Sequence, residues 1–222
     1  MNKFYKKISL LFLGGCVLSA CKKESKEEAV VFPLTFHMEG QEITPGVRLF
    51  TKDGEINDPG KIANFVKYHY YFQIPPITSN TKFPFLSFSS KNQAEFLYDS
   101  SQPLLDVVKK NNRFLFTSTK EKIWGDQGAT KGLFKHQHLR KIPNYELYYR
   151  KEMSVAYGDY KMLKFPHVRY FISRRIGNNI IEAHGNINNE INELFISTLR
   201  DNDTLAYTTY NTIGISVNNT SN

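Results

Sequence analysis

The chain has 222 residues, a formal net charge of +8 and a high aromatic content, with 17 Phe and 13 Tyr against a single Trp. Its only cysteines, Cys16 and Cys21, lie near the N-terminus, which excludes a disulfide, a thiolate metal site or a cysteine nucleophile from the rest of the chain. The length suits one domain with a sizeable core, and the aromatic residues favour strands.

The first 21 residues have the layout of a secretory signal. Three lysines precede an apolar run over residues 8–17, and two small residues then lead into Cys21. The run is about half the roughly 20 residues that a membrane-spanning helix needs. We therefore expect an export signal and no transmembrane anchor.

The tetrapeptide LSAC, Leu18–Cys21, resembles the lipobox of bacterial lipoproteins. The resemblance implies cleavage before Cys21 and acylation of that cysteine, and two or more acyl chains anchor a protein stably. The expected organisation is a signal peptide over residues 1–20, a lipidated cysteine with a charged tether over 21–29, and a single β-rich globular domain over 30–222. Position 22 is Lys and not the Asp that often retains lipoproteins in the inner membrane, so the resemblance implies sorting to the outer membrane. The domain could face either the periplasm or the cell surface.

Basic residues are concentrated in one part of the sequence. Removal of residues 1–20 takes away three lysines and leaves a charge of +5, and the stretch 131–175 contains eleven Lys or Arg against three acids. This stretch either binds an anionic envelope component or forms the solvent side of strands. Another envelope protein is the alternative partner, and no motif indicates nucleic acid.

In chain order, alternating apolar and polar residues predict strands over residues 31–40 and 46–56. Asp58 as N-cap and Pro59 at the first helical position then predict a short helix over 59–68. Strand-like segments follow from Tyr70 onward, with a hairpin turn at Asn111 and Asn112 because asparagine tolerates positive φ. A loop is expected over residues 124–132.

Two half-buried strands are expected over residues 145–150 and 168–175, followed by a helix that ends near Leu199 and a long final strand over 204–217. In the first of these strands the alternation places Tyr148 and Arg150 outward, as a possible contact surface. Many short strands with one or two short helices predict a mainly β fold, an antiparallel sandwich or barrel. The pattern leaves both architectures open, and only a barrel provides a lumen for a ligand.

The segments Gly46–Val66 and Asn192–Tyr207 resemble parts of small uncharacterised lipoproteins of Bacteroidota. The resemblance implies the same localisation in the cell envelope and a single domain. It does not imply any catalytic residues. The tripeptide Asp203–Leu205 also matches the O-glycosylation sequon of those bacteria, with Thr204 as the acceptor.

Catalytic signals are weak. His136 and His138 are the best metal candidates because residues i and i+2 of a strand share a face, with Asp126, His167 and His184 as possible third ligands. No common catalytic motif is present, and we expect no cofactor. The favoured function is a non-enzymatic envelope lipoprotein with a β-rich binding domain. A lipocalin-like carrier of a small hydrophobic ligand is the alternative, and a glycan-active enzyme is less favoured.

Overall fold

The computed structural model describes residues 29–73, 83–97, 104–125, 128–145 and 147–217. The chain divides into a short N-terminal unit, Met1–Val30, and a main unit, Val31–Asn222, and the fold is that of the main unit. The expected lipidation site, Cys21, lies outside the described residues. Within those ranges, none of the helices combines the length and the apolar character that a membrane span requires.

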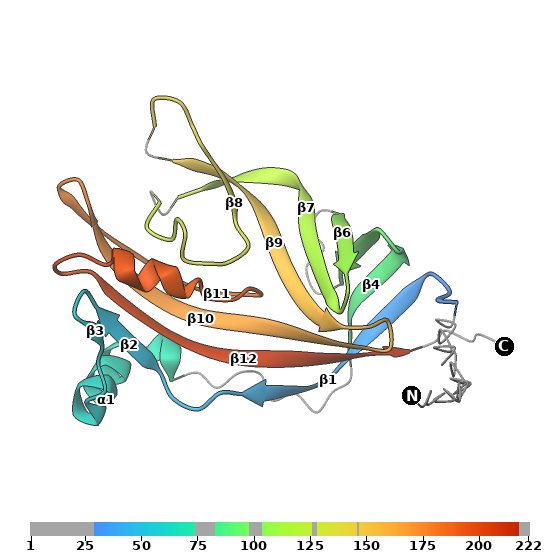
Figure 1. Ribbon diagram of the computed structural model, residues 1–222, viewed down its shortest axis with the longest axis horizontal. Helices are drawn as coiled ribbons and strands as arrows, with labels where there is room; N and C mark the ends of the chain where they lie inside the picture. The colour runs from blue at the N-terminus through green and yellow to red at the C-terminus, as the bar shows by residue number, and fades with distance from the viewer. Residues whose placement is uncertain (1–28, 74–82, 98–103, 126–127, 146, 218–222) are drawn as a thin grey trace, which may run out of the picture. The chain divides into compact units, whose positions relative to one another are not determined.

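Eight antiparallel strands close into a barrel (Figure 1). Their bounds are β1 Leu34–Ile43, β4 Pro84–Ser90, β5 Gln93–Phe96, β6 Leu105–Lys110, β7 Arg113–Trp124, β9 Tyr148–Gly158, β10 Met162–Ile176 and β12 Thr204–Val217. The ring runs β10-β9-β7-β6-β5-β4-β1-β12 and closes where β12 pairs with β10 over residues 162–173 of β10. Of the two architectures that the sequence left open, the structure shows the barrel.

The strands β10 and β12 continue beyond the ring and extend the same sheet with further strands, a part called here the outer sheet. The strand β11, Asn179–Ile187, pairs with residues 168–176 of β10. On the other side, β2, Arg48–Thr51, pairs with the start of β12, and β3, Gly54–Glu55, pairs with β2. The short strand β8, His138–Lys141, pairs with β9 off the ring.

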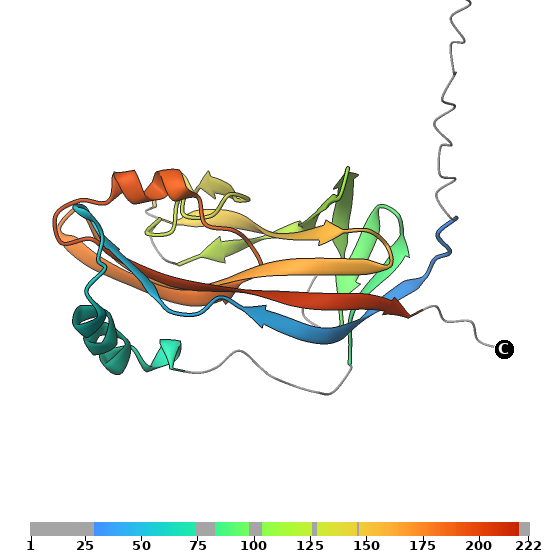
Figure 2. The same ribbon diagram turned by 60° about the horizontal axis from the view of Figure 1, so that its bottom comes forward.

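Both faces of this outer sheet are covered (Figure 2). The helix α1, Pro59–Tyr68, and the 3-10 helix η1, Tyr70–Phe72, pack Phe65 and Phe72 against Phe171 on one face. The 3-10 helix η2, Glu193–Thr198, packs Phe195 on the other face. The expectation that residues 168–175 form a half-buried strand is therefore wrong at its centre, because Arg169 and Phe171 are each only 7% exposed.

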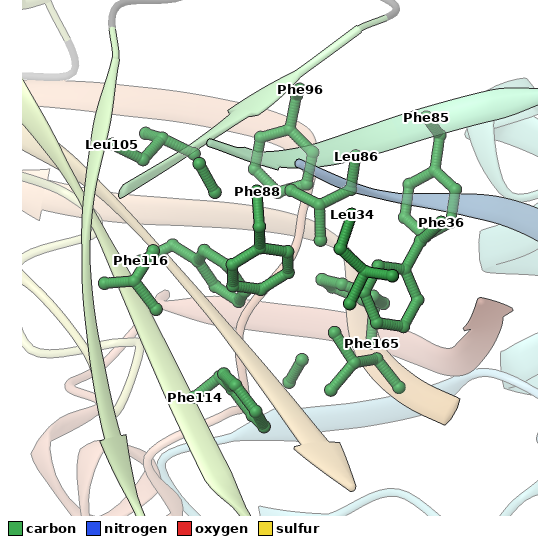
Figure 3. Close-up of a cluster of buried hydrophobic side chains, with 14 residues drawn as sticks. Leu34, Phe36, Phe85, Leu86, Phe88, Phe96, Leu105, Phe114, Phe116 and Phe165 are labelled. Carbon is green, nitrogen blue, oxygen red and sulfur yellow. The ribbon is translucent and has the colours of Figure 1, made fainter. Parts of the chain in front are cut away.

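Phenylalanine rings fill the barrel. The core cluster contains seven of them, Phe36, Phe85, Phe88, Phe96, Phe114, Phe116 and Phe165 (Figure 3). Phe88 lies among the rings of Phe36, Phe114 and Phe116, at centroid distances of 5.7, 6.0 and 5.8 Å. Tilted and edge-on pairs at such distances are the preferred aromatic geometry. Part of the high aromatic content of the sequence therefore serves to fill the barrel.

Local predictions agree well with the structure. The helix α1 spans the expected residues, and the Asp58 carboxylate accepts hydrogen bonds from the backbone N–H groups of Gly60 and Lys61 at 2.8 and 3.1 Å. The hairpin between β6 and β7 turns at Asn111, whose φ is +56°. The helix expected to end near Leu199 is shorter than predicted, because Ile187 belongs to β11 and only residues 193–198 are helical.

Candidate functional site

A pocket of about 260 Å³ lies beside the phenylalanine core, where β10 and β12 leave the ring. This volume is close to the lower end of the range of roughly 300–1,000 Å³ for ligand sites. The pocket draws its side chains from five ring strands and from the two segments that flank β4 and β11. Its lining residues are Met38, Gln41, Phe83, Phe85, Phe96, Phe165, His167, Asn188, Tyr210 and Thr212.

One side of the pocket is apolar and aromatic. Phe165 meets Phe85 edge-on at a centroid distance of 5.2 Å and an interplanar angle of 80°, and it meets Phe96 at 6.3 Å and 67°. Figure 3 shows these three rings at the margin of the barrel core. Met38 and Phe83 complete this wall. A wall of ring edges and faces offers a flat apolar guest contacts on several sides.

The pocket also includes a few polar side chains, and the register of the strands explains why they lie together. Gln41 on β1 lies directly opposite Thr212 on β12, and His167 on β10 lies directly opposite Tyr210. Side chains at directly opposed positions lie on the same face of a sheet. These two cross-strand pairs therefore bring four polar side chains from three strands to one end of the pocket.

A β-bulge in β1 turns Gln41 toward the pocket. Met38 is paired with Gly214, whereas Gly40 is paired with Ile213, so that Glu39 is an extra residue. Such a bulge inverts the inward and outward positions that follow it. The next residue, Glu42, is consequently directed outward, where its carboxylate accepts a hydrogen bond of 2.8 Å from Lys164.

The polar groups differ in how fully they are satisfied. Asn188 accepts a hydrogen bond from the backbone N–H of Val155 at 2.9 Å and donates one to the carbonyl of Pro166 at 2.9 Å, so its role is structural. The Gln41 Nε2 group donates to Thr212 Oγ1 at 3.4 Å. The Gln41 Oε1 atom is buried and has no hydrogen-bond partner within the described residues. An unsatisfied buried acceptor costs about 1–3 kcal/mol.

His167 is uncharged at neutral pH because burial lowers the pKa of its imidazole to about 4. Its ring stacks on that of Tyr210, which in turn accepts a hydrogen bond of 2.6 Å from Asn186 Nδ2. None of the ten lining residues is Lys, Arg, Asp or Glu. The wall of the pocket is therefore electrically neutral.

The two candidate metal ligands face different carboxylates. His136 Nε2 lies 3.7 Å from Glu190 Oε2, whereas His138 Nε2 lies 3.6 Å from Glu121 Oε1. Of the other candidate ligands, Asp126 lies outside the described residues, and His167 lines the pocket. No cluster of three His, Cys, Asp or Glu side chains able to hold a metal occurs in the part of the chain that the structure describes.

The expected outward position of Arg150 is wrong. Its guanidinium is 4.1 Å from the centre of the Trp124 ring, and the residue is 7% exposed. Tyr148 is half-buried and faces Gly128 and Lys131. The cause is that Trp124, at the end of the neighbouring strand β7, lies over the Arg150 guanidinium and shields it from solvent. A contact surface at Tyr148 stays a prediction.

Thr204 is the first residue of β12 and is half-buried, and its neighbour Asp203 is buried in an ion pair with Arg174. Four of the eleven basic residues in the stretch 131–175 pair with acids from elsewhere in the chain. Lys135 pairs with Glu190, Arg140 with Glu121, Lys164 with Glu42 and Arg174 with Asp203. These contacts distribute the positive charge over separate ion pairs, and an anionic partner stays a prediction.

Sequence reasoning missed the polar end of the pocket. The available signal was His167, a polar residue that continues the inward series of Leu163 and Phe165 along one strand. Gln41 carried no such signal, because its inward position depends on the bulge in β1. Comparisons with protein-family models, curated proteins and solved structures find no match to this chain. The structure thus shows a closed antiparallel β-barrel with a neutral, largely aromatic pocket among its described residues.

Proposed function

We propose that this chain is a lipid-anchored binding protein of the bacterial cell envelope that holds a small, mostly apolar molecule in a pocket beside its barrel core. The observation that carries the proposal is this pocket of about 260 Å³, which is mostly apolar and includes a few polar side chains. Sites for small ligands commonly combine apolar walls with a few polar groups that orient the ligand. A carrier of this kind is the alternative that a barrel, and not a sandwich, makes available.

The size of the pocket indicates the size of the ligand. An engineered apolar cavity of about 150 Å³ in another protein stays dry and binds benzene. A pocket of about 260 Å³ therefore suits a molecule somewhat larger than one six-membered ring. Because the lining includes no carboxylate, it lacks the paired acids on which most glycoside hydrolases depend. The binding role is accordingly favoured over glycan chemistry.

The anchor completes the proposal. The lipobox-like sequence at Leu18–Cys21 supports acylation of Cys21, and the charged residues 22–28 support a hydrated tether. Lys22 supports delivery to the outer membrane.

In a bacterial host that processes lipoproteins, the wild-type chain should fractionate with membranes and carry the mass of a diacylglyceryl group. The Cys21→Ser variant should lose both properties, and a variant that keeps the lipid mass would refute the anchor.

Native mass spectrometry tests the binding role. The sample is the unlipidated chain 21–222, since the main unit is compact by itself. The expected result is an added mass of a small molecule that denaturation releases and organic solvent extracts. A clean apoprotein mass, together with no binding of the neutral probe N-phenyl-1-naphthylamine, would refute the proposed function.

A further inference from the structure

The absence of charge from the described pocket wall limits the ligand to neutral molecules. The flanking ion pair of Glu42 with Lys164 lies on the outer face of the strands, and His167 is neutral. An ionised group buried against this wall would lose its hydration without meeting an opposite charge, which is unfavourable. A carboxylate attached directly to the ring of a bound ligand is therefore disfavoured at this site.

The rings around the pocket favour a flat ligand. Six of the ten lining residues carry an aromatic ring: Phe83, Phe85, Phe96, Phe165, His167 and Tyr210. The Phe85 and Phe165 rings are nearly perpendicular, whereas the His167 and Tyr210 rings are stacked and nearly parallel, with an interplanar angle of 3°. Aromatic pairs gain about 0.5–1.5 kcal/mol beyond area burial from edge-on or offset contacts. An aromatic guest makes such contacts here, and a flexible alkyl chain of equal size does not.

Gln41 favours a ligand that donates a hydrogen bond. Its Nε2 group is engaged by Thr212, while its Oε1 atom is a buried acceptor without a donor among the described residues. Because a side-chain amide turns about its last bond, Gln41 can present this oxygen to a bound molecule. A ligand with an N–H or O–H group would satisfy the oxygen, and a ligand without one would leave it unsatisfied.

We propose that the ligand of this pocket is a neutral, flat aromatic molecule of one or two rings that donates one hydrogen bond to the Gln41 amide. The inference rests on the proposed function, whose binding pocket it uses. Three matched probes distinguish its parts. Indole is flat and neutral and donates one N–H, indene has the same shape without the donor, and indole-3-carboxylate has the same ring with a negative charge.

Isothermal titration of chain 21–222 with the three probes tests this proposal. We expect indole to bind at least about tenfold more tightly than indene, and indole-3-carboxylate to show no binding. In the Gln41→Leu variant the preference for indole should fall below about twofold. Gln93→Leu, at an exposed position on β5, is the matched control and should keep the full preference. Gln41→Leu should bind indene as tightly as the wild type does, and this retained binding shows that a lost preference for indole is not a folding defect.

The outcomes separate the two proposals. Equal binding of indole and indene by the wild type, or an undiminished preference in Gln41→Leu, would overturn the assigned hydrogen bond. Binding of decanol or indole-3-carboxylate in place of the neutral aromatic probes would overturn the ligand class and leave the binding function standing. Failure of every probe, including N-phenyl-1-naphthylamine, would overturn the proposed function itself.

Discussion

The imidazole of His167 lies flat against the phenol ring of Tyr210, with ring centroids 4.7 Å apart and an interplanar angle of 3°. The two residues are direct cross-strand partners on β10 and β12, the pair of strands that closes the barrel. These two side chains lie where the barrel ends and the outer sheet begins, and they form part of the pocket wall. The strand pairing that closes the barrel therefore also places two of the pocket's rings.

Burial of His167 predicts a loss of stability in acid. Its folded-state pKa of about 4 lies below the ordinary value of 6.5, so between these values the unfolded chain binds a proton that the folded chain does not. Stability should therefore fall as the pH is lowered from 6.5 to 4, by about 3 kcal/mol from this group. Urea unfolding at pH 7 and pH 4 should show a smaller loss for His167→Phe than for the wild type.

The control for this prediction is His138→Gln, which changes a histidine whose side chain is 53% exposed. Its free energy of unfolding should follow the wild-type pH dependence, because His167 is retained. An identical pH dependence in the wild type and His167→Phe would contradict the assignment of the acid sensitivity to His167.

Truncation of Phe88 should destabilise the barrel without opening the pocket. Phe88 is completely buried among core rings and is not a pocket residue. We expect Phe88→Ala to lower the free energy of unfolding by about 3–5 kcal/mol. Val108→Ala on β6, where the side chain is 62% exposed, should change it by no more than about 0.5 kcal/mol. Similar losses in both variants, measured by urea unfolding, would show that the ring cluster is not the main core.

Gly214 makes room for Phe85. A Cβ atom at Gly214 would lie 2.7 Å from the Phe85 ring, closer than real Cβ contacts allow. Gly214→Ala should therefore cost about 1–3 kcal/mol through overpacking and displace Phe85, a pocket residue. In the double variant Gly214→Ala with Phe85→Leu, a double-mutant cycle should show a favourable coupling energy, since the smaller side chain relieves the clash.

The matched control is Gly40→Ala on the neighbouring strand β1, where an added Cβ atom meets nothing within 4 Å. Gly40→Ala should leave stability and probe binding close to wild type. Additive effects of Gly214→Ala and Phe85→Leu would mean that Phe85 does not occupy the space above Gly214.

Asp203 should be the most sensitive carboxylate of the outer sheet. It is 1% exposed and accepts hydrogen bonds from Arg174 Nε at 3.1 Å and from the backbone N–H groups of Arg175 and Arg200, each at 3.0 Å. Asp203→Ala should cost about 3–5 kcal/mol because it leaves a half-buried guanidinium without its partner. Asp201→Ala, which removes only the exposed contact with Lys52, should cost less than about 1 kcal/mol. Equal losses in thermal unfolding would contradict this ranking.

Elements that depend on near neighbours could be predicted from the sequence. The helix α1 follows from Asp58 and Pro59, whose effects act within one turn, and the hairpin follows from Asn111, which accepts positive φ by itself. The final strand β12 was likewise visible as a long alternating segment that begins after a turn. The export signal and the lipid anchor at Cys21 are also sequence features, and they stay predictions.

Only the tertiary structure decided barrel against sandwich, because the pairing of β10 with β12 joins segments that are distant in the chain. It also decided the exposure of Arg150 and the position of Gln41. Alternation assumes one covered face and an unbroken register, whereas Trp124 of β7 covers Arg150 on β9, and β1 contains a bulge. The pocket is built from such long-range pairings. The sequence by itself therefore determined the β-rich class and its local elements, and the closed ring of strands determined the binding site.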